Sequence, residues 1–165
     1  MNNKIKINHL NPSFYTKNTG SQYLQPKNGR GYGILSIDIH GFTFGIPLHS
    51  SIRKESGFIL ERTKDGKRRG LDYNKAVIIK DKNDVGRTFK IPSKQLTIIR
   101  KNEDLIIKEF SKFVYEFIYR AKINDNNVLN RTYKNSTLHY YKEDLLKFTA
   151  ILSNPLSTIA STYNK

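Results

Sequence analysis

The sequence predicts an α+β fold: a compact single domain in which a strongly twisted antiparallel β-sheet or partial barrel packs against two main C-terminal helices. Three observations predict it. The chain has 165 residues, which suits one domain with one core. Residues 33–100 contain a series of short strand-like stretches, of which 33–40 and 42–48 alternate apolar and polar residues as half-buried strands do. Over residues 102–152 the apolar spacing changes to the three-and-four pattern of helices.

Residues 1–32 form an irregular basic segment that is rich in Asn, Gly, Pro and Gln. We expect a short strand followed by a long loop, and a long loop inside a small domain is usually functional or disordered. Tyr15 and Tyr32 lie in this segment. Their rings could stack on nucleic-acid bases or pack over the edge of the sheet.

The sheet is expected from five strand-like stretches and a possible sixth. The residues His40 and Gly41 separate the first two stretches and predict a tight hairpin turn. A basic loop at 63–73 separates the third stretch from the fourth. The expected strands are 33–40, 42–48, 57–60, 75–81, 87–92 and, as the possible sixth, 93–100.

The helices are expected after Asn102, which is a plausible N-cap. Acidic residues follow it, and Arg120 and Lys122 close the same helix, as the helix dipole favours. Residues 124–135 are expected to form a loop. Ser136 would then cap a second helix that runs to residue 152, before a tail at 153–165 that we expect to fray.

The charge balance predicts a polyanionic partner. The chain has 29 Lys and Arg against 14 Asp and Glu, which gives a net charge of +15. A lysine-rich composition alone does not explain why acids are half as many as bases. Such a surplus repels itself unless a polyanion is near, so we expect nucleic acid, with an anionic membrane as the weaker option.

Composition and motifs narrow the chemistry further. Cysteine is absent, which excludes disulfides and thiolate chemistry, and no apolar leader or run of membrane-spanning length occurs, so we expect a cytoplasmic protein. No P-loop, GxGxxG, HExxH or GxSxG motif is present. The four histidines lack ligand spacing and the acids form no cluster. We therefore expect neither a metal nor another cofactor.

RNA can be cut without a metal, because its own 2′-hydroxyl can attack the neighbouring phosphorus. The protein must supply a proton acceptor, donors for the charge on the phosphoryl oxygens and an acid for the leaving oxygen. The stretch PLHSSIRK, residues 47–54, places His49, Ser50, Arg53 and Lys54 where a strand ends. The alternative is a polar loop that solvates the strand end. Ser50 suits a hydrogen-bond donor better than a covalent nucleophile.

Other basic and aromatic side chains are expected to hold RNA rather than to cut it. The basic loop reads as a hairpin tip that grips phosphates, and Asp72 is expected only to fix a turn. The expected RNA-binding residues are Ser51, Lys64, Lys67, Arg68, Arg69, Tyr32 and Lys80.

Three segments together resemble the toxins of type III toxin–antitoxin systems. They are RGYGILSIDIHGFTFGIPLHSSI (30–52), GLDYNKAVIIKD (70–81) and NSTLHYYKEDL (135–145). These toxins form the ToxN/AbiQ group, and the match is closer to the related CptN and TenpN branches. The resemblance covers about residues 10–148.

The resemblance implies a metal-independent, sequence-selective endoribonuclease that leaves a 2′,3′-cyclic phosphate and a 5′-hydroxyl. Its twisted sheet would be similar to that of the MazF and Kid toxins. A repetitive antitoxin RNA, cut by the toxin into pseudoknotted units, would inhibit it in a closed protein–RNA assembly. Cellular and phage RNA would be the substrates, the function would be phage defence, and neither DNA nor a membrane would be a partner.

The resemblance also implies site residues. The family's serine falls on Ser50, and His49 stands where the ToxN branch has threonine. The lysine that follows has Arg53 or Lys54 as its nearest match. Ser50 and either Arg53 or Lys54 would bind the scissile phosphate, while His49 would transfer a proton.

Three further positions follow from the same resemblance. The family's upstream lysine matches Lys27, but two extra residues follow it here, so Arg30 is the alternative. Lys27 is also a second candidate for proton transfer. The family's N-terminal tyrosine matches Tyr15.

From another functional class, the alternative is a non-catalytic protein that binds structured RNA, and a membrane-surface protein is the distant third.

Overall fold

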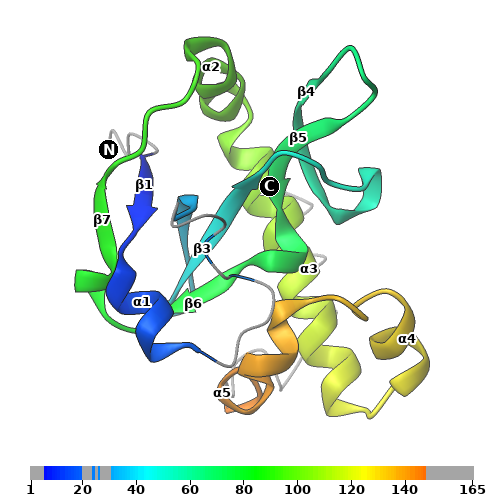
Figure 1. The fold of residues 1–165 in the computed structure, drawn as a ribbon. Coiled ribbons are helices and arrows are strands. Elements are labelled where there is room, and N and C mark those ends of the chain that lie inside the picture. The colour runs from blue at the N-terminus through cyan, green and yellow to red at the C-terminus, as the bar shows by residue number, and fades with distance from the viewer. Residues whose placement is uncertain (1–5, 20–23, 25, 27–30, 148–165) are drawn as a thin grey trace.

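One antiparallel sheet contains all seven strands found in the described residues, which are 6–19, 24, 26 and 31–147 of the computed structural model (Figure 1). Its order is β4-β5-β3-β2-β1-β7, and β6 pairs with β3 off this path. The strands are β1 (Ile7–Leu10), β2 (Gly33–Ile39), β3 (Phe42–His49), β4 (Gly57–Arg62), β5 (Arg68–Asp72), β6 (Val77–Ile79) and β7 (Val85–Thr88).

The predicted hairpin at His40 and Gly41 is confirmed. Ile39 pairs with Phe42, so a two-residue turn joins β2 to β3. Both turn residues have positive φ, 46° at His40 and 87° at Gly41, which is the conformation that two-residue hairpins require. This turn fixes the register of β3 and therefore the place where β3 ends, at His49.

Two different strands share the second edge of β3. Its first half, from Thr43 to Gly45, pairs with β6, and its last two residues, Leu48 and His49, pair with β5. The change of partner spans Ile46 and Pro47, and proline has no N–H for a ladder. The β4–β5 hairpin therefore extends away from the β6 end of the sheet, and His49 lies where the two diverge (Figure 1).

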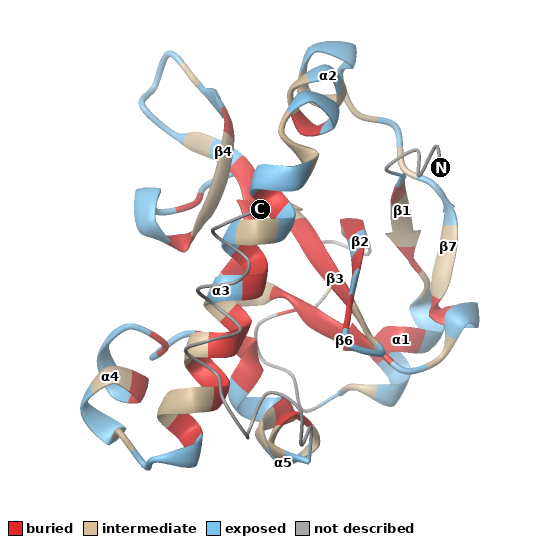
Figure 2. Ribbon diagram, turned by 180° about the vertical axis from the view of Figure 1, so that it is seen from behind, coloured by how far each residue is buried: buried red, intermediate tan, exposed pale blue. Residues whose placement is uncertain are grey.

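Helix α3 (Glu103–Lys122) supplies the helical side of the core. Phe110 and Phe44 are both fully buried and meet edge to face with ring centroids 5.3 Å apart. Burial of each such side chain contributes about 1.5–3 kcal/mol. Figure 2 shows buried residues along β3, along β6 and on the side of α3 that faces them. The α+β class is thus confirmed.

The remaining helices are short and mostly differ from the prediction. They are α1 (Pro12–Lys17), α2 (Ser93–Lys101), α4 (Asn126–Arg131) and α5 (Lys142–Leu146). The helix α1 lies inside the expected N-terminal loop, and α4 lies inside the loop expected at 124–135. The side chain of Asp125 accepts a hydrogen bond from the Val128 N–H, a cap that starts α4.

Three expectations about the sheet and its flanks differ from the structure. The possible sixth strand at 93–100 is helix α2, in which Ile99 is buried in the core and Ile98 packs partly against it. The basic loop at 63–73 contains strand β5, so only 63–67 form a tip. The second helix expected from residue 137 begins as a 3₁₀ turn, Thr137–Tyr141, followed by α5, and its expected end at 148–152 lies outside the described residues, as does the tail.

Within the part of the chain that the structure describes, each helix is too short or too polar to cross a bilayer.

Candidate active site

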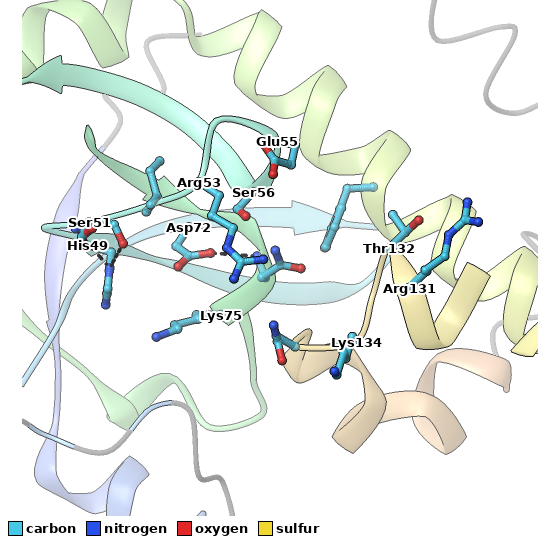
Figure 3. Close-up of a pocket in the computed structure, with 14 residues that line it drawn as sticks. His49, Ser51, Arg53, Glu55, Ser56, Asp72, Lys75, Arg131, Thr132 and Lys134 are labelled. Carbon is cyan, nitrogen blue, oxygen red and sulfur yellow. Dashed lines mark hydrogen bonds between the residues drawn. The ribbon is translucent and has the colours of Figure 1, made fainter. Parts of the chain in front are cut away.

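A cavity of about 490 Å³ opens where β3 ends. Four parts of the chain line it: the end of β3 with the loop that follows, the end of β5 with its 3₁₀ turn Tyr73–Lys75, one residue of α3, and the end of α4 with the next loop (Figure 3). The cavity thus unites positions that are more than 80 residues apart in the sequence, from His49 to Asn135.

His49 is the last residue of β3, and its ring has a fixed orientation. Its Nδ1 lies 2.8 Å from the carbonyl oxygen of Ser51. The Ser51 N–H also points at this nitrogen, at the longer distance of 3.3 Å. A carbonyl only accepts hydrogen bonds, so the shorter contact favours the tautomer with the proton on Nδ1, in which Nε2 is the basic nitrogen, whereas the N–H contact suits the other tautomer. The arrangement suits a residue that takes up and releases a proton.

Asp72 lines the same cavity and is almost fully buried, with 5% of its surface exposed. It ends β5, and its side chain accepts a hydrogen bond from the Asn74 N–H at 3.1 Å, which confirms the predicted turn-fixing role. Burial raises the pKa of the Asp72 carboxyl, against the opposing charges of His49 and Lys75. Asp72 is therefore a buried acid beside an imidazole.

The sequence prediction missed Asp72 as a site residue. The signal, an aspartate in front of a buried strand, is common at turns. Only the pairing of β5 with the end of β3, where Gly70 lies opposite His49, brings Asp72 to the cavity. A local pattern does not contain that pairing.

The cavity is electropositive. Four cationic side chains line it, against the two carboxyl groups of Glu55 and Asp72. Cations that converge from separate segments attract an anion such as a phosphodiester. The cations are Arg53, Lys75, Arg131 and Lys134.

Buried contacts hold the far wall of the cavity, residues 131–135, in place. The Tyr133 hydroxyl, on a side chain 1% exposed, donates to the Phe113 carbonyl at 2.8 Å. The buried Thr137 hydroxyl bonds the Asn74 carbonyl at 3.1 Å, which ties this wall to the turn after β5. Arg131 and Lys134 are thereby placed opposite His49. Their position was missed because 124–135 looked like an ordinary polar loop.

Asn74 contributes a polar atom without a partner. Its Oδ1 is buried in the cavity wall and forms no hydrogen bond with any described residue. A buried acceptor of this kind costs free energy unless a ligand or water donates to it.

The predicted cluster at 49–54 is only partly brought together. His49, Ser51 and Arg53 line the cavity, whereas Ser50 is exposed and does not line it. Lys54 begins the 3₁₀ turn Lys54–Ser56 and lines a neighbouring cavity instead.

The two tyrosines of the N-terminal segment differ in environment. Tyr15 is buried; its hydroxyl accepts a hydrogen bond from the Tyr32 N–H at 2.9 Å, and it lines a separate cavity. Burial raises the pKa of the Tyr32 phenol, and the negative charge of Asp72 raises it further. Lys27 and Arg30 lie outside the described residues.

The expected phosphate-gripping cations lie away from the cavity. Lys64 is exposed at the hairpin tip, where Lys67 pairs with Asp65 at 3.0 Å. Arg69 is 3.7 Å from Glu61 and Arg68 is half-buried. Lys80 pairs with Asp144 of α5 at 2.7 Å. The hairpin cations form an arm beside the site, and Lys80 belongs to the α5 side.

Among the described residues, no three His, Asp or Glu side chains gather as a metal site. No protein-family model matches the chain, and neither a curated protein nor a solved structure is significantly similar to it. The function has to be inferred from the site itself.

Proposed function

We propose that the protein is a metal-independent endoribonuclease, the toxin of a type III toxin–antitoxin system. One observation carries the proposal: an oriented histidine and a buried acid face a cavity lined by four cationic side chains. Imidazole, carboxyl group and fixed positive charge are the parts that transesterification of RNA requires.

The reaction breaks one P–O bond and forms another. The 2′-oxygen bonds to phosphorus while its proton moves to a base, and the P–O5′ bond breaks while an acid delivers a proton to O5′. The products are a 2′,3′-cyclic phosphate and a free 5′-hydroxyl. This step consumes no water, and the proposed mechanism uses no metal ion.

His49 takes the role of general base through Nε2, because Nδ1 is bound to the Ser51 carbonyl. Asp72 is the candidate acid. Because its pKa is raised, the Asp72 carboxyl stays protonated up to a higher pH than an exposed aspartate does. The buried Oδ1 of Asn74 gives the ribose hydroxyl a hydrogen-bond acceptor, which favours RNA over DNA.

The cations stabilise the charge that develops on the phosphoryl oxygens. Arg53 and Lys75 come from the His49 side of the cavity, and Arg131 and Lys134 from the opposite wall. A phosphodiester between the two walls would contact charges on both sides. Preorganised charge of this kind is often the largest single contribution to catalysis.

The antitoxin part of the proposal has separate support. It comes from the resemblance of residues 30–52, 70–81 and 135–145 to the ToxN/AbiQ group, closest to CptN and TenpN. The β4–β5 hairpin, with its four basic residues at 64–69, would hold the backbone of a repeat-derived pseudoknot RNA. Phage defence would follow from release of the toxin.

The test is incubation of purified protein with RNA in excess EDTA. We expect cleavage, with 2′,3′-cyclic phosphate and 5′-hydroxyl ends identified by mass spectrometry. His49→Asn should lower the rate by about 10²-fold or more, while His40→Asn, in the exposed β2–β3 turn, should not. Intact RNA with the wild-type protein, or equal rates for the two variants, would overturn the proposal.

The same assay separates the alternative function. A non-catalytic RNA-binding protein would retain structured RNA without cut products, and its affinity would be insensitive to His49→Asn.

A further inference from the structure

A second, smaller cavity of about 310 Å³ adjoins the candidate active site. The two cavities share Glu55, Phe113 and Thr132 as a common wall. A ligand that fills both would therefore pass over Phe113. A volume near 300 Å³ is at the lower end of the range for small-molecule sites.

One face of helix α3 forms the floor of the second cavity. Glu109 and Glu116 each lie three or four residues from both Lys112 and Phe113, which places the four on one side of the helix, and all four line the cavity. Lys54 approaches from the loop after β3. The cavity therefore combines an aromatic side chain with hydrogen-bond acceptors and donors.

The acceptor on Glu109 has a fixed position. The hydroxyl of Tyr73 donates to its Oε2 at 3.1 Å, and Tyr73 is itself buried. Burial raises the pKa of the Tyr73 phenol, and the neighbouring Glu109 carboxylate raises it further. The hydroxyl therefore keeps its proton and remains a hydrogen-bond donor. This bond orients the carboxylate of Glu109, a residue that is otherwise exposed.

Phe113 is half-buried and is packed by Tyr133, with centroids 4.9 Å apart, and more distantly by Tyr73 at 6.1 Å. These contacts hold its ring in place between the two cavities. An aromatic ring in this position can stack on a planar base, which contributes about 1–3 kcal/mol in single-stranded nucleic-acid complexes.

We infer that the second cavity binds the base of a nucleotide that flanks the scissile phosphate, and that it selects bases with an exocyclic amino group. This inference rests on the proposed function. Carboxylates accept hydrogen bonds from the amino groups of guanine, adenine and cytosine, whereas uracil presents carbonyl oxygens on both sides of its single N–H. Lys54 or Lys112 can donate to a base carbonyl. Glu109 is the specificity-determining residue, and Tyr73 positions it.

Cleavage mapping on a random-sequence RNA pool in EDTA tests the inference. For the wild-type protein we expect uracil to be disfavoured about tenfold at one position next to the cut, the effect of one charged hydrogen bond. Glu109→Gln should relax that preference, because an amide can both donate and accept. Glu143→Gln, an exposed glutamate of α5, is the matched control and should leave the preference unchanged.

A binding experiment keeps the inference testable even without cleavage. Competition by the four 3′-nucleoside monophosphates should place 3′-UMP last for the wild-type protein, and Glu109→Gln should bring 3′-UMP level with the others. Tyr73→Phe should weaken the discrimination without abolishing cleavage.

The outcomes separate the two proposals. Cleavage with the same base preference in wild type and Glu109→Gln would overturn the base site and leave the nuclease standing. Absence of cleavage by the wild-type protein would overturn the nuclease, and equal binding of the four nucleotides would overturn the base site.

Discussion

Asp72 is the residue whose environment differs most from what its sequence context indicates. It fixes a turn, as expected, but it does so inside a cavity and beside His49. Its burial raises the pKa of its carboxyl, so in the folded protein this group releases its proton at a higher pH than in the unfolded chain, where 3.8 is the reference. Protein stability and the proposed chemistry therefore depend on the same proton.

The first prediction concerns stability against pH. Between the unfolded and folded pKa values of Asp72 the native state binds more protons, so this residue lowers the free energy of unfolding as pH rises through that window. Asp72→Asn removes the buried charge and keeps an oxygen for the Asn74 N–H. We expect the variant to be more stable than wild type in urea at pH 8, with the difference shrinking toward pH 4. A difference independent of pH would contradict this.

The second prediction compares two neighbouring serines. The family resemblance assigns the phosphate contact to Ser50, whereas only Ser51 lines the cavity. We expect Ser51→Ala to slow RNA cleavage about tenfold or more, the loss of one hydrogen bond to a charged group, and Ser50→Ala to have a smaller effect. The measurement is the initial rate on one RNA substrate. The reverse order would restore the assignment that the resemblance gives.

At the residue scale, prediction from sequence succeeded where the chemistry was local. His49, Ser51 and Arg53 are close in the chain and remain close in the cavity. Arg131 and Lys134 could not be predicted, because their position depends on the buried Tyr133 and its bond to the Phe113 carbonyl.

At the element scale, the β4–β5 hairpin depends on close backbone approach. A Cβ at Gly70 would lie 2.1 Å from the Phe58 carbonyl oxygen and 2.8 Å from Cδ1 of Ile52. The first of these neighbours is backbone and cannot move aside without disturbing the strand pair. Gly70 is also the residue opposite His49 on β3.

The third prediction follows from that approach. Gly70→Ala should destabilise the protein by about 1–3 kcal/mol through overpacking, and it should slow RNA cleavage because it disturbs the strand that carries Asp72. Gly66→Asn, at the tip of the same hairpin, is the control, since the site is open and Asn tolerates a φ of +80°. Thermal unfolding measures the stability of both variants. Equal unfolding midpoints for Gly70→Ala and Gly66→Asn would contradict the prediction and show that the hairpin adjusts to the added methyl group.

Element boundaries show why the sequence misled in two places. Ile98 and Ile99 have high strand propensity, but both pack against the core from a helix, so tertiary packing outweighs that propensity in α2. The charged residues at 64–69 looked like a loop because a solvated hairpin buries little on its outer face. The β2–β3 hairpin was predicted correctly, since both its alternation and its turn are local signals.

At the scale of the whole molecule, charge and fold class were accessible from sequence because both are sums over many residues. The net charge of +15 predicts affinity for polyanions but not where they bind. The structure places four of these cations around one cavity.

The fourth prediction is a steep salt dependence of RNA binding. If the four cavity cations each neutralise one phosphate, log K should fall with log salt with a slope of about −3 for single-stranded RNA. Contacts by the hairpin cations would make it steeper. Titration of labelled RNA with the His49→Asn variant avoids cleavage during the measurement. A slope near zero would exclude phosphate contacts at this cavity.

The cavity wall is completed only by residues 131–135, late in the chain. During synthesis the strand bearing His49 emerges long before that wall, so a nascent chain displays the imidazole without the guanidinium and ammonium groups of Arg131 and Lys134. A ribosome engaged in making this protein would thus carry a half-built cavity, and the nuclease activity proposed above would require that residues 131–135 had emerged as well.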